Sequence, residues 1–221
     1  MEKLIDNKTA EQVKSFLGQI DNPVEMTFFS TKNNCQYCGE IESLLTEITS
    51  LSDQYSLVIK DFDTDLESRE KFKIHSAPVF VLAGKNGSET IDYGIRYYGL
   101  PSGHEFSSLI NDLRLVSKKD SGLTPETRKF LSELKTPLHL QVFVTPTCPY
   151  CPQSVVLAHQ MAMESSYVTA DMIEAMEFPE LSEKFGVSGV PQTTINDGAG
   201  TVVGGVHEHQ LVEKIKQALA I

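Results

Sequence analysis

One short pattern occurs twice in the sequence, more than a hundred residues apart. The stretches TKNNCQYCG and TPTCPYCP each contain a Cys-x-x-Cys pair, Cys35 with Cys38 and Cys148 with Cys151, and the chain of 221 residues has no other cysteine. The first cysteines of the two pairs are 113 positions apart, and so are the second cysteines. A fixed offset of this kind predicts two copies of one structural unit.

The same offset relates other parts of the chain. Pro78 and Pro191 are also 113 positions apart, and the stretches KFKIHSAP and KFGVSGVP that lead to them align without a gap. An amphipathic helical pattern precedes each cysteine pair, at residues 8–19 and 124–135. The duplication therefore covers most of the chain.

The joint between the two units is expected near residue 120. The segment VSKKDSGLTPE, at residues 116–126, is polar and contains the Gly and Pro residues typical of a connection. This predicts an N-terminal unit at residues 1–119 and a C-terminal unit at residues 120–221. A chain of this length can bury a modest core in each unit.

The fold class of each unit is predicted to be α/β. Hydrophobic periodicity in the first unit predicts alternating helices and strands, at helix 8–19, strand 24–30, helix 38–52, strand 55–62, helix 65–73, two strands after Pro78 and helix 103–115. The second unit repeats this order. Strands that alternate with helices and end in a hairpin predict a mixed central sheet flanked by helices on both faces.

Composition and charge argue against several classes of protein. The net charge of −11 at pH 7 offers no basic surface to phosphates, so we expect no nucleic-acid partner. No apolar run reaches the roughly 18 residues of a membrane span, so we expect no membrane partner. The N-terminal stretch MEKLIDNKTAEQVKSF lacks the pattern of a secretory signal, which predicts a cytoplasmic location.

The cysteine pairs are predicted to be redox-active. In each unit the first cysteine follows a strand and the second lies in the first turn of a helix, whose free N–H groups and partial positive charge favour a thiolate. The first cysteine is then the nucleophile, and the second can attack the mixed disulfide that forms. We assign Cys35 and Cys148 as nucleophiles and Cys38 and Cys151 as resolving cysteines.

A structural zinc site is the alternative to redox activity for these cysteines. Two Cys-x-x-Cys pairs also supply the four thiolates of a tetrahedral zinc site. Zinc modules usually separate their pairs by about 15 to 20 residues, whereas these pairs are more than a hundred residues apart in separate repeats. We therefore expect no metal and no other bound cofactor.

Together these motifs resemble a known family. Cys-x-x-Cys between a strand and a helix, with a proline about forty residues later, is similar to the thioredoxin fold, and Cys148-Pro149-Tyr150-Cys151 is the glutaredoxin motif. Two such units, together with the stretches DYGIRYYGLPSGHEF and VSGVP, resemble the glutaredoxin-like protein disulfide oxidoreductases. The resemblance implies two tandem thioredoxin-like units.

The resemblance also carries expectations about function. It implies thiol–disulfide exchange on disulfide-bearing protein substrates, with electrons from a thioredoxin-reductase-type flavoenzyme. It implies that Pro78 and Pro191 follow cis peptide bonds and face the cysteine pairs. The backbone of Ala77 or Val190 could then pair with an extended substrate segment.

One feature departs from the thioredoxin pattern. Thioredoxins have a buried Asp on the strand before the motif, whereas the strands MTFFS and LQVFV offer no carboxylate. Asp61 and Glu174 occupy equivalent positions at the end of the next strand, and we consider them as proton acceptors near the resolving cysteines. Solvated acids at strand ends, or water as the acceptor, are the alternatives.

Three functions are consistent with these residues. The first is an enzyme, a protein disulfide oxidoreductase that cycles both pairs between dithiol and disulfide. The second is a dithiol electron carrier between a flavoenzyme and a peroxiredoxin, because the N-terminal region of the flavoprotein that serves alkyl hydroperoxide reductase is similar. The third, which is not enzymatic, is a metal-binding module.

Overall fold

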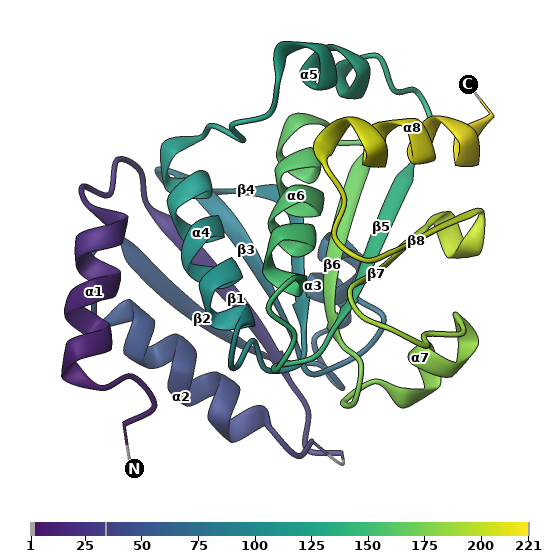
Figure 1. The fold of residues 1–221 in the computed structure, drawn as a ribbon. Coiled ribbons are helices and arrows are strands. Elements are labelled where there is room, and N and C mark those ends of the chain that lie inside the picture. Colours follow the sequence, from purple (N-terminus) through teal and green to yellow (C-terminus); the bar gives the residue numbers. More distant parts are fainter. Residues whose placement is uncertain (1–2, 34, 221) are drawn as a thin grey trace.

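The computed structural model describes residues 3–33 and 35–220. Within these residues, eight strands form one mixed sheet in the order β2-β1-β3-β4-β6-β5-β7-β8 (Figure 1). The first four of these strands come from the first half of the chain and the last four from the second half. Each half therefore contributes one continuous side of the sheet.

The first half begins with a helix and then follows the order predicted from the sequence. Its elements are α1 (Asn7–Leu17), β1 (Val24–Ser30), α2 (Cys38–Thr49), β2 (Tyr55–Asp61), α3 (Leu66–Phe72), β3 (Val79–Asn86), β4 (Glu89–Tyr98) and α4 (Glu105–Lys118). The boundaries agree with the periodicity because the apolar side chains of α2 fall on one face and are buried there.

The second half repeats this order with a short 3-10 turn added. Its elements are α5 (Pro125–Ser132), β5 (Leu138–Val144), α6 (Cys151–Glu164), β6 (Val168–Glu174), α7 (Pro179–Lys184), β7 (Gln192–Ile195), η1 (Asn196–Gly198), β8 (Gly200–Val203) and α8 (Glu208–Leu219). Helix α5 begins where the sequence predicts, because Thr124 caps its N-terminus and Pro125 occupies the first turn.

The two halves join through a pair of parallel strands. Strand β4 pairs with β6 from Ile95 opposite Ala170 to Tyr98 opposite Ile173. The sequence predicts a central sheet in each unit, and the structure merges the two into one. The merger satisfies the backbone hydrogen bonds that β4 and β6 would otherwise leave open at the edges of separate sheets.

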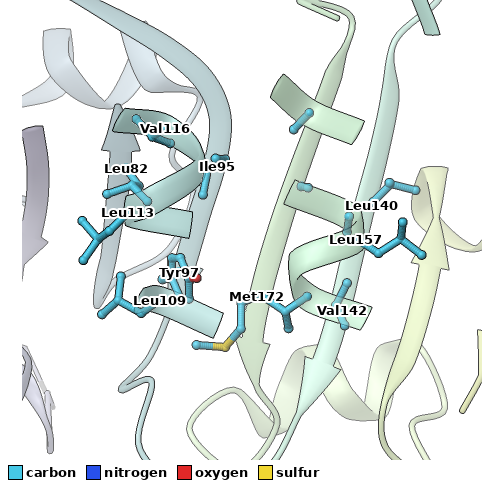
Figure 2. Packing of buried hydrophobic residues seen from close by; sticks show 14 of the residues in the cluster. Leu82, Ile95, Tyr97, Leu109, Leu113, Val116, Leu140, Val142, Leu157 and Met172 are labelled. Atoms are coloured by element: carbon cyan, nitrogen blue, oxygen red, sulfur yellow. The ribbon is translucent and has the colours of Figure 1, made fainter. Parts of the chain in front are cut away.

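The sheet separates a large core from a small one. Helices α1, α2, α4, α6 and α8 cover one face, and Figure 2 shows α4 and α6 side chains such as Leu109 and Leu157 packed over the central strands. The short helices α3 and α7 supply the aromatic cluster on the opposite face, which includes Phe72 and Phe178. Side chains alternate along β4, so Tyr97 enters the large core and Tyr98 the small one.

None of the helices in the described part of the chain has both the length and the apolarity that a membrane span needs.

Candidate active site

The first cysteine pair lies at the junction between β1 and α2. Cys38 is the first residue of α2, and Cys35 lies in the turn before it. The two sulfurs form a disulfide with an Sγ–Sγ distance of 2.04 Å. The Cys38 Sγ also lies 3.6 Å from the carbonyl oxygen of Thr31, at the end of β1.

The second pair has the same position in its half and differs in state. Cys151 begins α6 and is fully buried, whereas Cys148 is half-buried, and both are free thiols. The Cys148 Sγ lies 3.6 Å from the carbonyl oxygen of Val190. Only the first cysteine of this pair can therefore meet a large substrate.

The start of each helix is free to stabilise a thiolate. The N-cap residues are Tyr37 for α2 and Tyr150 for α6, and neither caps its helix with a side-chain hydrogen bond. The first N–H groups of a helix have no partner within the helix, and the helix dipole is positive at this end. The N–H groups at these helix starts are therefore left for another acceptor, and the assignment of Cys35 and Cys148 as nucleophiles stays a prediction.

A proline loop follows α3 and α7 in the two halves. The Ala77–Pro78 and Val190–Pro191 peptide bonds are both cis, as the resemblance implied. In the second half, the contact between Cys148 and Val190 places this loop directly against the cysteine pair. The backbone before Pro191 therefore lines the second cysteine site, and the use of Ala77 and Val190 to bind a substrate stays a prediction.

A cleft of about 590 Å³ connects the first site with the second half of the chain. Tyr37, Ala77 and Pro78 line it from the first site, while Pro146 and Glu174 line it from the second half. Pro146 lies two positions before Cys148 in the sequence. The cleft thus brings residues of both halves to one binding surface.

Comparison with known proteins identifies the second half. Residues 138–217 match the thioredoxin domain family. Over 190 residues the chain is 28% identical to the alkyl hydroperoxide reductase protein AhpF from Staphylococcus aureus, and the match covers 84% of this chain. The chain spans about a third of that relative's length, since the match covers 33% of it.

Solved structures extend the similarity to both halves. The N-terminal domain of AhpF from Enterococcus faecalis superposes with a TM-score of 0.85 at 25% identity, covering 95% of this chain and 99% of that one. A protein disulfide oxidoreductase from Aeropyrum pernix gives the same TM-score, 0.85, at 28% identity, covering 96% and 92%. The chain has a two-unit thioredoxin fold. It shares this arrangement with both solved structures.

The two acids predicted at the strand ends both cap loops. The Asp61 Oδ1 accepts hydrogen bonds from the N–H groups of Asp63 and Thr64, at 2.9 and 3.2 Å. The Glu174 Oε2 accepts from Met176 and Glu177 in the same way, at 3.0 and 2.7 Å. The same hydrogen-bonding geometry occurs in both halves, so each acid has a structural role as a loop cap. Their role as proton acceptors stays a prediction.

A different carboxyl belongs to the helix start that meets the loop of the second pair, where the His104 N–H donates to the carbonyl oxygen of Pro146 at 2.9 Å. Glu105, the first residue of α4, is 2% exposed, and burial raises its pKa to about 7. The pKa of the Cys151 thiol is raised by burial first, then by Cys148, and also by the charge of Glu105. The chain therefore holds a buried acid whose charge acts on the second cysteine pair.

Sequence reasoning missed Glu105 because the residue belongs to the other half of the chain. The sequence predicts proton acceptors only on the strand before each cysteine motif or on the strand after it. Glu105 lies 43 positions before Cys148, in the stretch PSGHEF, with no local pattern that marks it. Helix α4 is the last helix of the first unit. Its N-terminus meets the cysteine pair of the second unit only after folding, so its place in the repeat was the available signal.

In residues 3–33 and 35–220, no three side chains of His, Cys, Asp or Glu converge as a metal site requires.

Proposed function

We propose that the chain transfers electrons to protein disulfides, with Cys148 and Cys151 as one site and Cys35 and Cys38 as the other. The observation that carries this proposal is the arrangement of the second pair. A half-buried thiol lies before an uncapped helix, next to the Val190 carbonyl, and its fully buried partner starts the helix. This arrangement suits a nucleophile that meets substrate and a second thiol that resolves the product.

The proposed reaction at the second site has two steps. The Cys148 thiolate attacks one sulfur of the substrate disulfide, forms a mixed disulfide and releases the other substrate sulfur as a thiolate, which takes up a proton. Cys151 then loses its proton to Glu105 and attacks the Cys148 sulfur. This forms the Cys148–Cys151 disulfide and releases the second substrate sulfur as a thiolate, which takes up a proton, so the substrate gains two electrons and the protein loses them.

The surfaces before the prolines are proposed to hold the substrate. The backbone of Ala77 and Val190 can pair with an extended segment, and Pro78 and Pro191 fix the shape of each loop. At the first site the cleft lined by Tyr37 and Pro78 adds side-chain contacts. These assignments follow from the position of the loops beside the cysteine pairs.

The test is insulin disulfide reduction by four proteins. We compare the unchanged chain, Cys35→Ser/Cys38→Ser, Cys148→Ser/Cys151→Ser and a variant with all four substitutions. Activity is expected in the first three and none in the fourth. Activity in the variant without cysteines would refute the proposal, and the two double variants measure what each site contributes.

A second candidate is a dedicated dithiol carrier. It is favoured by the similarity to AhpF, the alkyl hydroperoxide reductase protein, over 84% of this chain. In this role a thioredoxin-reductase-type flavoenzyme would reduce the chain, and a peroxiredoxin would oxidise it. Rapid turnover with a peroxiredoxin and none with insulin would favour the carrier. The flavoenzyme and the peroxiredoxin both belong to a reducing compartment such as the cytoplasm.

We also propose that the two units divide near residue 120, at residues 1–119 and 120–221. Helix α4 ends at Lys118 and α5 begins at Pro125, so no helix or strand crosses this point. Limited proteolysis is expected to cut between these helices and to leave two fragments that stay associated through β4 and β6. Earlier cleavage inside either half would contradict this division.

A further inference from the structure

A line of polar side chains runs through the apolar contact between α4 and α6. We call it the polar seam, and it consists of Tyr97, Glu105, Ser108, Asp112 and His159. All five are nearly inaccessible to solvent, with exposures between 0 and 2%. Apolar side chains of similar volume at such positions would usually be neutral for stability or favourable, so buried ionisable groups here call for another explanation.

The seam is closely hydrogen-bonded at one end. The Asp112 Oδ2 lies 2.5 Å from the Tyr97 hydroxyl, which donates to it, and 2.5 Å from the His159 Nδ1. The Tyr97 and His159 rings meet edge to face, with centroids 5.0 Å apart. These contacts fix His159 of the second half against Asp112 of the first.

The other end of the seam lies at the start of α4, where the His104 N–H donates to the carbonyl oxygen of Pro146 at 2.9 Å, in the loop before Cys148. The Ser108 hydroxyl lies 2.6 Å from the Glu105 Oε2. In the described part of the chain, the Glu105 Oε1 and the His159 Nε2 have no hydrogen-bond partner. Cys151 and His159 are eight positions apart on α6, or about two helical turns, so one helix face carries both.

The groups that face Glu105 have opposing effects on it. Its own helix contributes Ser108 and Asp112, α6 contributes Cys151 and His159, and β4 contributes Tyr97. After burial, which raises the pKa of Glu105, Ser108 and His159 lower that pKa and Asp112 raises it. The hydrogen-bonded pair of Asp112 and His159 therefore acts on Glu105 through two opposing effects.

We propose that Asp112 and His159 are positioning residues that set the charge of Glu105, and so the pH at which Cys151 resolves the mixed disulfide. The inference rests on the proposed function of the second site. Because α4 belongs to the first half and α6 to the second, the first half thereby controls the chemistry of the second. Neither residue touches the substrate or a reacting sulfur.

The experiment isolates the resolving step. Every protein carries Cys35→Ser/Cys38→Ser and is reduced before the assay. It then reacts with an aromatic disulfide. Attack by Cys148 releases one coloured thiolate, and attack by Cys151 on the mixed disulfide releases a second. The rate of the second release is measured from pH 5.5 to 9. In the unchanged second site this rate is expected to rise with pH through the pKa of Glu105, and Glu105→Gln should remove the rise.

The two seam variants are expected to move this midpoint in opposite directions. His159 lowers the pKa of Glu105, so His159→Gln should raise that pKa and shift the midpoint up by about one pH unit. Asp112 raises the pKa of Glu105, so Asp112→Asn should shift the midpoint down. Loss of structure alone would slow both variants without opposite shifts, and Met161→Leu, a buried apolar exchange on α6, should leave the midpoint unchanged.

The outcomes separate the inference from the function on which it rests. If no second release occurs in the unchanged second site, the proposed function fails. If the release occurs and depends on Glu105, but its midpoint is the same in His159→Gln and Asp112→Asn, the inference alone is overturned. Should His159→Gln not fold, His159→Phe refills the space with an apolar ring, and the same upward shift is expected.

Discussion

The Sγ of Cys148 lies 3.6 Å from the carbonyl oxygen of Val190, although 42 positions separate the two residues in the chain. The contact joins the start of α6 to the loop before Pro191. Under the proposed function, a substrate disulfide that reaches Cys148 would also meet the Val190 backbone. Recognition of the substrate chain and attack on its sulfur would then occur at one place.

The exposures of the two thiols predict which variant traps a substrate. Cys151→Ser leaves Cys148 free to attack and removes the group that would release the product, so a stable mixed disulfide is expected. Cys148→Ser should trap none, because Cys151 is fully buried. Non-reducing electrophoresis with a disulfide-bearing substrate checks this in a Cys35→Ser/Cys38→Ser background, and trapping through Cys151 would reverse the assigned roles.

The same difference predicts the order of chemical labelling. Burial, Cys148 and Glu105 all raise the pKa of Cys151, so this thiol is protonated at neutral pH as well as inaccessible. After reduction and brief treatment with iodoacetamide at pH 7, mass spectrometry should find the label on Cys148 at least tenfold more often than on Cys151. Equal labelling in folded protein would contradict the buried position of Cys151, and labelling in denaturant is the control.

Glu105 predicts a dependence of stability on pH. Its folded pKa of about 7 is above its ordinary value of 4.5, so the folded protein holds the proton more tightly than the unfolded chain does. Stability that is present below pH 4.5 is therefore lost as the pH rises to about 7. Glu105→Gln should remove this loss and raise the free energy of unfolding by up to about 3 kcal/mol at pH 8, with little effect at pH 4.

Chemical denaturation at both pH values measures this difference. Glu183→Gln, at an exposed acid on α7, is the matched control and should show no such dependence on pH. An equal effect of Glu105→Gln at pH 4 and pH 8 would mean that the Glu105 carboxyl is not perturbed by burial.

The joint between the halves predicts a sensitive glycine. Gly94 has a φ of +79°, and an added Cβ would lie 2.5 Å from the carbonyl oxygen of Val168 on β6. Gly94→Ala should force β4 away from β6 and lower the free energy of unfolding by about 2 to 4 kcal/mol.

A second glycine separates backbone strain from this collision. Gly87 has a similar φ of +62° with no atom within 4 Å of an added Cβ, so Gly87→Ala should cost only about 1 kcal/mol. Denaturant unfolding of the two variants compares them directly. Equal losses would show that the contact between β4 and β6 is not the cause.

Much of the fold could be predicted because its signals are local. The strand at residues 24–30 and the amphipathic helix after Cys38 follow from periodicity, and the structure contains both as β1 and α2. The 113-residue repeat predicted the same order of elements in each half. Periodicity could not predict the pairing of β4 with β6. The hydrophobic pattern of a strand is the same whether the strand lies at the edge of a sheet or joins two sheets.

The sequence by itself determined the chemistry, since two Cys-x-x-Cys pairs at the starts of helices, each followed by a proline at the same distance, leave few other uses for four cysteines. Only the tertiary structure decided which acids of the first half come near the second site. Asp61 and Glu174 are predicted as proton acceptors from their nearness along the chain, whereas the helix that begins at Glu105 meets the second site from the other half. Contacts between helices of different units depend on how whole faces pack, and no local pattern encodes that arrangement.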